Sequence, residues 1–254
     1  MLRFLLLLMV GVAILVVVGV VGLLALGDSD SDPDDTANTG VVTPANGSTP
    51  EPGLTAEEVL QQASTAAAEV SSFHFVLTHE NGSTPLPLSL SLESAEGDVV
   101  VPGRLAAEVD AEAAGINVSV DVIGIDDRTW ITNPFTRGWQ ELEGTNIRDF
   151  ADPAALVSGL LPSITDAELS DGGSVDGVQT QLVTGNIESG ALREALGIAE
   201  PGRTVEVEAW IGVDDDLPRR VRVIGPLSDA EADNVVRQVD ISRYDQPVEI
   251  MPPE

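Results

Sequence analysis

The sequence predicts an α+β fold: one large, curved antiparallel β-sheet with a few helices on its concave side, plus one N-terminal transmembrane helix. Three observations predict it. After residue 54, most of the chain alternates apolar with polar residues between short turns, which is typical of strands with one buried face. Segments with helical spacing are too few to cover both faces of such a sheet. The first 27 residues contain one unbroken apolar run.

That apolar run extends from Phe4 to Leu26. As a helix it would be about 34 Å long, enough to cross a bilayer. Arg3 precedes it and Asp28 opens a series of aspartates after it, so we expect the N-terminus in the cytoplasm and the rest outside the cell membrane. The alternative is a cleaved signal sequence ending near Ala25-Leu26-Gly27, which would leave a secreted domain. The run exceeds the about 7–15 residues of a signal core, which favours an uncleaved anchor over residues 1–27.

Composition and charge exclude several partners and sites. The chain has 254 residues, 42 of them acidic and 12 basic, and a net charge of -30. A nucleic-acid surface needs a basic patch, so we expect no nucleic-acid partner. The chain has no cysteine, which excludes disulfides and thiolate metal sites. Residues 28–53 are rich in Asp, Pro and Thr, and we expect a disordered linker there, followed by one folded domain over residues 54–254.

The domain opens with a helix predicted from Thr55 to Val70. Thr55-Ala-Glu-Glu58 matches a capping box, and a broad apolar stripe follows it at helical spacing. Asp152-Pro153 supplies the cap and first residue of a second helix, Pro153 to Leu161. A third, Ser189 to Leu196, ends at Gly197. We expect strands at Phe73–Thr78, Leu86–Leu92, Val99–Val101, Leu105–Glu112, Gly115–Ile125, Arg128–Thr132, Trp139–Leu142, Ile164–Leu169, Val178–Thr184 and Val235–Ile241.

The stretch from Arg203 to Ile224 gives the clearest strand signal. Its β-branched residues alternate with polar ones on both sides of Asp214-Asp215-Asp216, which has the chemistry of a turn. One hairpin cannot keep such an apolar strip out of water alone, so further strands of the same kind must join it. The alternation predicts the register of the hairpin: Glu208 opposite Arg222, Trp210 opposite Arg220, and Ala209 opposite Val221.

No residue pattern predicts catalysis. His74 and His79 lie five residues apart on one strand, so their side chains point to opposite faces, and we interpret them as ordinary strand and turn residues. No Gly-x-Ser-x-Gly sequence is present. The acidic runs at Asp126-Asp127, Asp171-Gly172-Gly173 and Asp214 to Asp216 lack the spacing of a calcium loop, and we interpret them as turns. We therefore expect no enzyme, no metal and no cofactor.

Two apolar features suggest a binding site. Trp130, Trp139 and Trp210 either rim a ligand cleft or pack across neighbouring strands, and strand propensity favours packing. A second set is either ordinary core or the wall of a lipid cavity, and both would be equally apolar. These seven residues are Leu88, Leu90, Val109 and Val120 on strands, and Leu156, Leu160 and Leu161 on the second helix.

The order of several motifs resembles a known family. They are Phe73-His74-Phe75, Gly97 to Leu105, Ile123 to Trp130, Gly138-Trp139, Asp152-Pro153, Val205 to Ile211, and Asp240 to Pro247. In this order they resemble the mycobacterial LppX/LprA/LprF/LprG-type lipoproteins. The resemblance implies a half-barrel similar to the LolA/LolB lipoprotein carriers, with a cavity for acyl chains of envelope lipids or glycolipids. Members of that family carry a lipidated cysteine, which this chain lacks, so a transmembrane helix would replace that anchor.

We therefore expect an extracytoplasmic, membrane-anchored binding or carrier protein for lipids or glycolipids. Burial of acyl chains would supply about 0.8 kcal/mol per methylene. The alternative is a non-enzymatic envelope sensor or protein-interaction module on the same fold with a filled core, which would bind an envelope protein partner. A hydrolase has no residue pattern in its favour.

Overall fold

The computed structural model describes residues 53–86, 90–143, 161–196, 199–200 and 202–254. The predicted membrane segment lies outside these residues, as do the predicted linker up to residue 52 and nearly all of the predicted helix Pro153–Leu161. No helix within the described ranges is long and apolar enough to span a bilayer.

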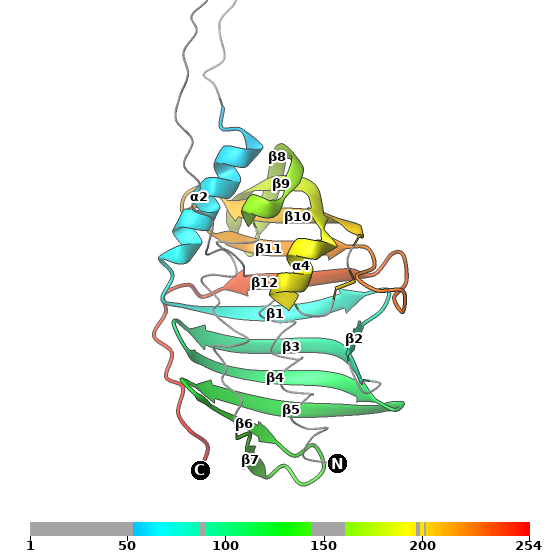
Figure 1. Ribbon diagram of the computed structural model, residues 1–254. Coiled ribbons are helices and arrows are strands. Elements are labelled where there is room, and N and C mark those ends of the chain that lie inside the picture. Colours follow the sequence, from blue (N-terminus) through cyan, green and yellow to red (C-terminus); the bar gives the residue numbers. More distant parts are fainter. Residues whose placement is uncertain (1–52, 87–89, 144–160, 197–198, 201) are drawn as a thin grey trace, which may run out of the picture.

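The described part of the chain forms one 12-stranded sheet in which every pairing is antiparallel (Figure 1). The strand order is β7-β6-β5-β4-β3-β1-β12-β11-β10-β9-β8, with β2 pairing to β3. The first and last strands of the domain therefore meet at its centre. The strands are β1 (Ser72–Glu80), β2 (Thr84–Leu86), β3 (Leu90–Val100), β4 (Arg104–Ala113), β5 (Ile116–Ile125), β6 (Arg128–Thr132), β7 (Trp139–Glu141), β8 (Thr165–Val175), β9 (Val178–Glu188), β10 (Thr204–Gly212), β11 (Pro218–Ile224) and β12 (Val236–Ser242).

The register of the β10–β11 hairpin is the one predicted from its alternation. Glu208 lies opposite Arg222, Trp210 opposite Arg220, and Ala209 opposite Val221. Because adjacent residues point to opposite faces, this register places the charged pairs on one side of the sheet and the apolar pair on the other.

Two strand predictions were wrong at glycines. Leu90 to Val100 is one continuous strand, where the sequence suggested two segments on either side of Gly97. A side chain at Gly97 would lie 2.4 Å from the Ala106 carbonyl oxygen, so glycine is needed for close approach of β3 and β4. Gly172-Gly173 lies inside β8 beside a register shift, and the turn into β9 is Asp176-Gly177 instead. A bulge absorbs the glycine pair without ending the strand.

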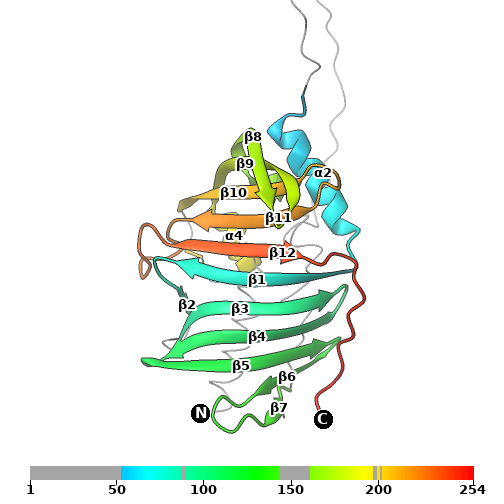
Figure 2. The same ribbon diagram turned by 180° about the vertical axis from the view of Figure 1, so that it is seen from behind.

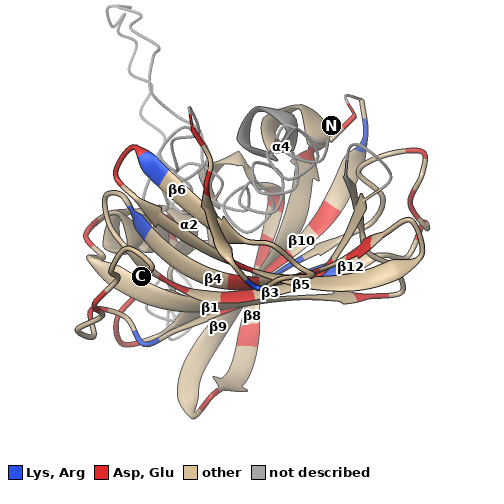
Figure 3. Cartoon of the chain, turned by 90° about the horizontal axis from the view of Figure 1, so that it is seen from below, with Lys and Arg blue, Asp and Glu red and all other residues tan. Residues whose placement is uncertain are grey.

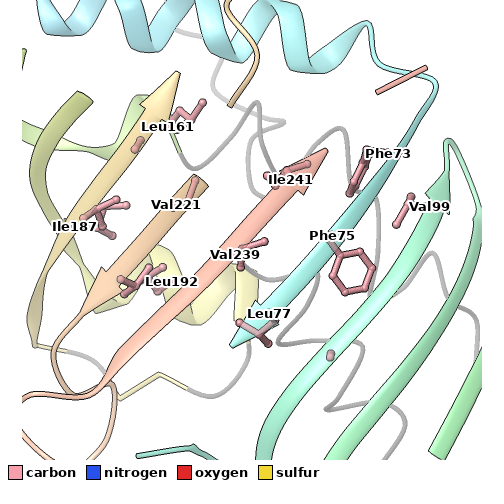
Figure 4. Close-up of a cluster of buried hydrophobic side chains, with 14 of the residues drawn as sticks. Phe73, Phe75, Leu77, Val99, Leu161, Ile187, Leu192, Val221, Val239 and Ile241 are labelled. Atoms are coloured by element: carbon pink, nitrogen blue, oxygen red, sulfur yellow. The ribbon is translucent and has the colours of Figure 1, made fainter. Parts of the chain in front are cut away.

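The helices agree with the sequence where they are described. Helix α2 (Ala56–Ala68) begins at the predicted capping box, with Thr55 and Glu58 bonding each other's backbone. Its buried face includes Val59 and Leu60. Helix α4 (Ser189–Leu196) has the predicted bounds, and the 3-10 turn η2 (Leu161–Ser163) precedes β8. Seen from below, the sheet curves toward the side that carries α4, whereas α2 crosses the ends of the strands (Figures 3 and 4).

The prediction of a curved antiparallel sheet is thus confirmed, with one described helix in its curve and one across its end. We call the side of the sheet that carries α4 the inner face, and the opposite side the outer face. Phe73, Phe75 and Leu77 of β1 point to the inner face and belong to the hydrophobic core (Figure 4). His74 and Val76, which alternate with them, point to the outer face.

Candidate functional site

The inner face carries an unbroken apolar row across eight strands. Strand pairing places its members directly opposite one another, from β9 through β10, β11, β12, β1, β3 and β4 to β5. Each side chain is at most 5% exposed. Adjacent strands are about 4.8 Å apart, so the row forms an apolar wall about 34 Å wide around the curve. Its members are Val183, Ala209, Val221, Val239, Leu77, Ala95, Val109 and Val120.

The described helices cover one half of this wall. Helix α2 contacts β8, β9 and η2, and α4 contacts β9. In Figure 1 both lie toward the β8 to β12 half of the sheet, and no described helix lies over β3, β4 or β5. The side chains of this other half are nevertheless apolar, with Leu90, Val109 and Val120 each 2% exposed.

The predicted cavity residues fall into two groups. Leu90, Val109, Val120 and Leu161 belong to one buried apolar cluster, and Val109 lies directly opposite Val120. Leu88, Leu156 and Leu160 lie outside the described residues. The structure therefore brings four of the seven into one core, and their role as a lipid cavity stays a prediction.

A polar cluster occupies the inner face at the end where β1 finishes and β12 begins. Arg237 pairs with Glu231, and each side chain is only 3% exposed. Arg237 Nε donates to Thr84 Oγ1 at 2.8 Å, and Nη1 donates to the Gly225 carbonyl at 3.3 Å. The ion pair with Glu231 compensates the buried charge of Arg237, although Arg237 Nη2 makes no hydrogen bond within the described residues.

His79 completes this cluster as a neutral side chain. Its Nδ1 lies 2.8 Å from the Glu93 carbonyl, which can only accept, so Nδ1 carries the proton. Its Nε2 lies 2.8 Å from Thr84 Oγ1 and accepts from that hydroxyl. Burial lowers the pKa of His79 to about 4 despite the raising effect of the Glu93 carbonyl. No local pattern predicts this cluster, because its members come from three distant segments.

A second concave region lies on the outer face, over β1, β3, β4 and β5. It is a groove of about 760 Å³. His74 lines it, with Nδ1 at 2.9 Å from Asp98 Oδ1 and Nε2 at 3.4 Å from Glu96 Oε1, and Arg243 lies beside both His74 and Asp98. His74 and His79 therefore point to opposite faces, as predicted. We call this region the acidic groove, defined by His74, Val76, Glu96, Asp98, Ala106, Glu108, Asp110, Asp121, Ile123, Trp139 and Arg243.

The tryptophans lie on the outer face and divide between the two predicted roles. Trp210 stacks with Arg220 across the β10–β11 pair at 5.9 Å, and Trp130 stacks with Arg128 at 4.5 Å, which is packing across neighbours. Trp139 instead lines the acidic groove.

The acidic runs occupy turns or a bulge. Asp215 accepts from the Leu217 amide in the β10–β11 turn, and Asp171 accepts from the Gly173 amide in the β8 bulge. Asp126 adopts a φ of 54° between β5 and β6. No group of three or more metal-ligating side chains is close enough to hold an ion among the described residues.

Comparison with known proteins identifies related chains. The model of the LppX_LprAFG lipoprotein family matches residues 55–250. The lipoarabinomannan carrier protein LprG of Mycobacteroides abscessus is 23% identical over 164 residues, which are 65% of this chain and 72% of that protein. LprF from Mycobacterium bovis superposes with a TM-score of 0.59 at 18% identity, covering 78% of this chain and 96% of its own. LppX from Mycobacterium tuberculosis gives 0.56 at 20% identity, covering 77% and 98%.

Proposed function

Because the chain belongs to the LppX_LprAFG lipoprotein family, we propose that it binds and carries envelope lipids or glycolipids outside the cytoplasm. Their acyl chains would lie against the β3 to β5 half of the inner face. The apolar row across eight strands is the observation that carries this proposal. A relative named as a lipoarabinomannan carrier supports it.

The driving force would be burial of apolar surface. Each methylene withdrawn from water contributes about 0.8 kcal/mol, so chains of ordinary length supply ample binding free energy without catalysis. The polar headgroup would stay at the mouth of the curve. The polar cluster around Arg237 would close the end where β1 finishes, because Arg237 is already held there by Glu231, Thr84 and the Gly225 carbonyl.

The apolar segment Phe4 to Leu26 would anchor the carrier, in place of the lipidated cysteine that this chain lacks. Residues 28–53 would then act as a tether that limits how far the domain can reach. An anchored domain of this kind would hold or hand over lipids near one membrane.

The test is to purify the full chain and identify bound lipid by native mass spectrometry and solvent extraction. We expect one lipid class at a stoichiometry near one, and uptake of a fluorescent fatty-acyl probe by delipidated protein. Absence of both would overturn the proposal.

A pair of substitutions separates a lipid wall from an ordinary packed core. Val109→Phe intrudes into the half of the inner face that no described helix covers, whereas Val183→Phe intrudes where α2 and α4 contact β9. We expect Val109→Phe to reduce probe uptake. Val183→Phe should leave uptake intact and cost about 1–3 kcal/mol through overpacking. If Val109→Phe lowers Tm equally and leaves uptake unchanged, the region is filled core.

A further inference from the structure

The acidic groove contains carboxylates that face one another directly. Strand pairing sets Glu96 of β3 opposite Glu108 of β4, and Glu108 opposite Asp121 of β5. Like charges in directly opposed cross-strand positions destabilise a sheet. Three in one row therefore cost stability, and the described basic side chains beside the row are His74, 3.4 Å from Glu96, and Arg137, 3.7 Å from Asp121.

The other half of the outer face has the opposite arrangement. Arg222 donates to Glu208 at 2.8 Å, and Arg220 donates to Asp240 at 2.6 Å. Both are cross-strand pairs of opposite charge. The same sheet thus pairs its charges from β10 to β12 and opposes them from β3 to β5, so acidic composition alone does not account for the row.

The described chain supplies little positive charge to the groove. Five carboxylates line it, whereas its described basic side chains are Arg243 and His74, and both of these lie against Asp98. Glu108 accepts from the Ser119 hydroxyl, which adds a hydrogen bond but no positive charge. Arg137 approaches Asp121 at 3.7 Å and is 56% exposed, so this pair contributes little.

The groove is open and has an apolar element. Figure 2 views the outer face directly, and no described helix lies over β1, β3, β4 or β5. A volume of about 760 Å³ accommodates several side chains of a bound ligand. Trp139 and Ile123 line it beside the carboxylates. A ligand that fits therefore carries positive charge together with apolar groups.

We propose that the acidic groove binds an Arg- or Lys-bearing segment of a partner protein that also carries apolar side chains. Anionic lipid surfaces and nucleic acid are repelled by the groove's charge. The described carboxylates do not converge on a point that could hold a metal ion. The chain's own linker, residues 28–53, has no Lys or Arg and cannot serve. The proposed partner would contact the face of the sheet opposite to the proposed lipid wall.

The test measures binding of a fluorescein-labelled peptide that alternates arginine with leucine to the full chain, by fluorescence anisotropy. The groove variant combines Glu96→Gln, Glu108→Gln and Asp121→Asn, which remove charge and keep shape. The control variant removes the same charge from the outer face of β8, β9 and β10 with Glu168→Gln, Glu188→Gln and Glu206→Gln. We expect the groove variant to weaken binding by about tenfold or more, and the control by no more than about twofold.

Further arms test the class of ligand. Trp139→Ala should weaken binding of the arginine–leucine peptide several-fold and leave binding of an arginine–glycine peptide unchanged. Equal losses in the groove and control variants would mean attraction by net charge alone and would overturn the proposal. Spermine or Ca²⁺ displacing the peptide at equal concentration would overturn it too. The groove variant should retain its bound lipid, so failure here is distinguishable from failure of the lipid proposal, and circular dichroism confirms its fold.

Discussion

Removing the middle carboxylate of the groove should stabilise the free protein. Glu108 is flanked by Glu96 on one side and Asp121 on the other, and Glu108→Gln relieves both repulsions. The amide oxygen of glutamine can still accept from Ser119 Oγ, which lies 3.0 Å from Glu108 Oε1. The substitution therefore removes charge with little loss of hydrogen bonding.

The magnitude follows from the pairing geometry. Directly opposed side chains are about 5 Å apart, and two unit charges at that distance repel by about 0.8 kcal/mol in water. Screening at about 0.15 M salt reduces each repulsion by roughly half, so relief of both gives about 0.9 kcal/mol. For a domain of this size, that raises Tm by about 2–3 °C. At about 1 M salt the gain falls to about 0.3 kcal/mol.

The matched control is Glu208→Gln, which makes the same chemical change in the paired half. Glu208 accepts from Arg222 at 2.8 Å and its side chain is 19% exposed, so its loss should destabilise by about 1 kcal/mol. Differential scanning calorimetry of both variants at low and high salt measures the difference. A fall in Tm for Glu108→Gln, or a gain that does not shrink with salt, would refute the reasoning.

Three further predictions concern stability. Burial lowers the pKa of His79 to about 4, so between pH 6.5 and about 4 only the unfolded state is protonated at this histidine. The free energy of unfolding should therefore decrease as the pH is lowered across that window, by up to about 3 kcal/mol. His79→Gln should flatten that slope in urea titrations, and an unchanged slope would contradict the assignment. Gly97→Ala should lower stability by about 1–3 kcal/mol, since its methyl meets the Ala106 backbone; an unchanged urea midpoint would argue against the close approach. Thr55→Ala should cost about 1 kcal/mol through loss of the cap, whereas Thr55→Ser should restore the wild-type midpoint.

Local pattern was sufficient where neighbours in sequence are neighbours in space. The β10–β11 register followed from alternation on both sides of one turn, and the start of α2 followed from the Thr55 to Glu58 capping box. Both features depend on residues within about 20 positions of one another. Alternation also identified Leu90, Val109 and Val120 as members of one apolar face.

Pairing between distant segments was not predictable in this way. Phe75 lies opposite Ile241 in the pairing of β1 with β12, which joins the two halves of the sheet and makes the eight-strand row continuous. No local propensity encodes a partner so far along the chain. The polar cluster was missed for the same reason, since Thr84 and Arg237 are 153 positions apart.

The acidic groove illustrates a subtler limit. In the sequence, Glu108 alternates with apolar neighbours, a pattern that indicates an ordinary solvent-exposed face of a strand. Only the registers of two successive hairpins reveal that Glu108 faces Glu96 and Asp121, because a shift of one residue would have separated them. The predicted strands stopped at Leu92 and resumed at Val99, so they did not include Glu96 and gave no register for it in β3.

The two proposed sites share the same four strands, and this links them physically. Leu77, Ala95, Val109 and Val120 form the inner row on β1, β3, β4 and β5, and each is adjacent in sequence to Val76, Glu96, Glu108 or Asp121 of the groove. A ligand that changes the twist of these strands on one face moves side chains on the other, because successive residues share a backbone. If a basic partner binds the lipid-free carrier more tightly than the lipid-bound carrier, then bound lipid must weaken partner binding by the same free energy. A segment docked outside the curve could therefore promote release of a lipid held inside it without touching that lipid.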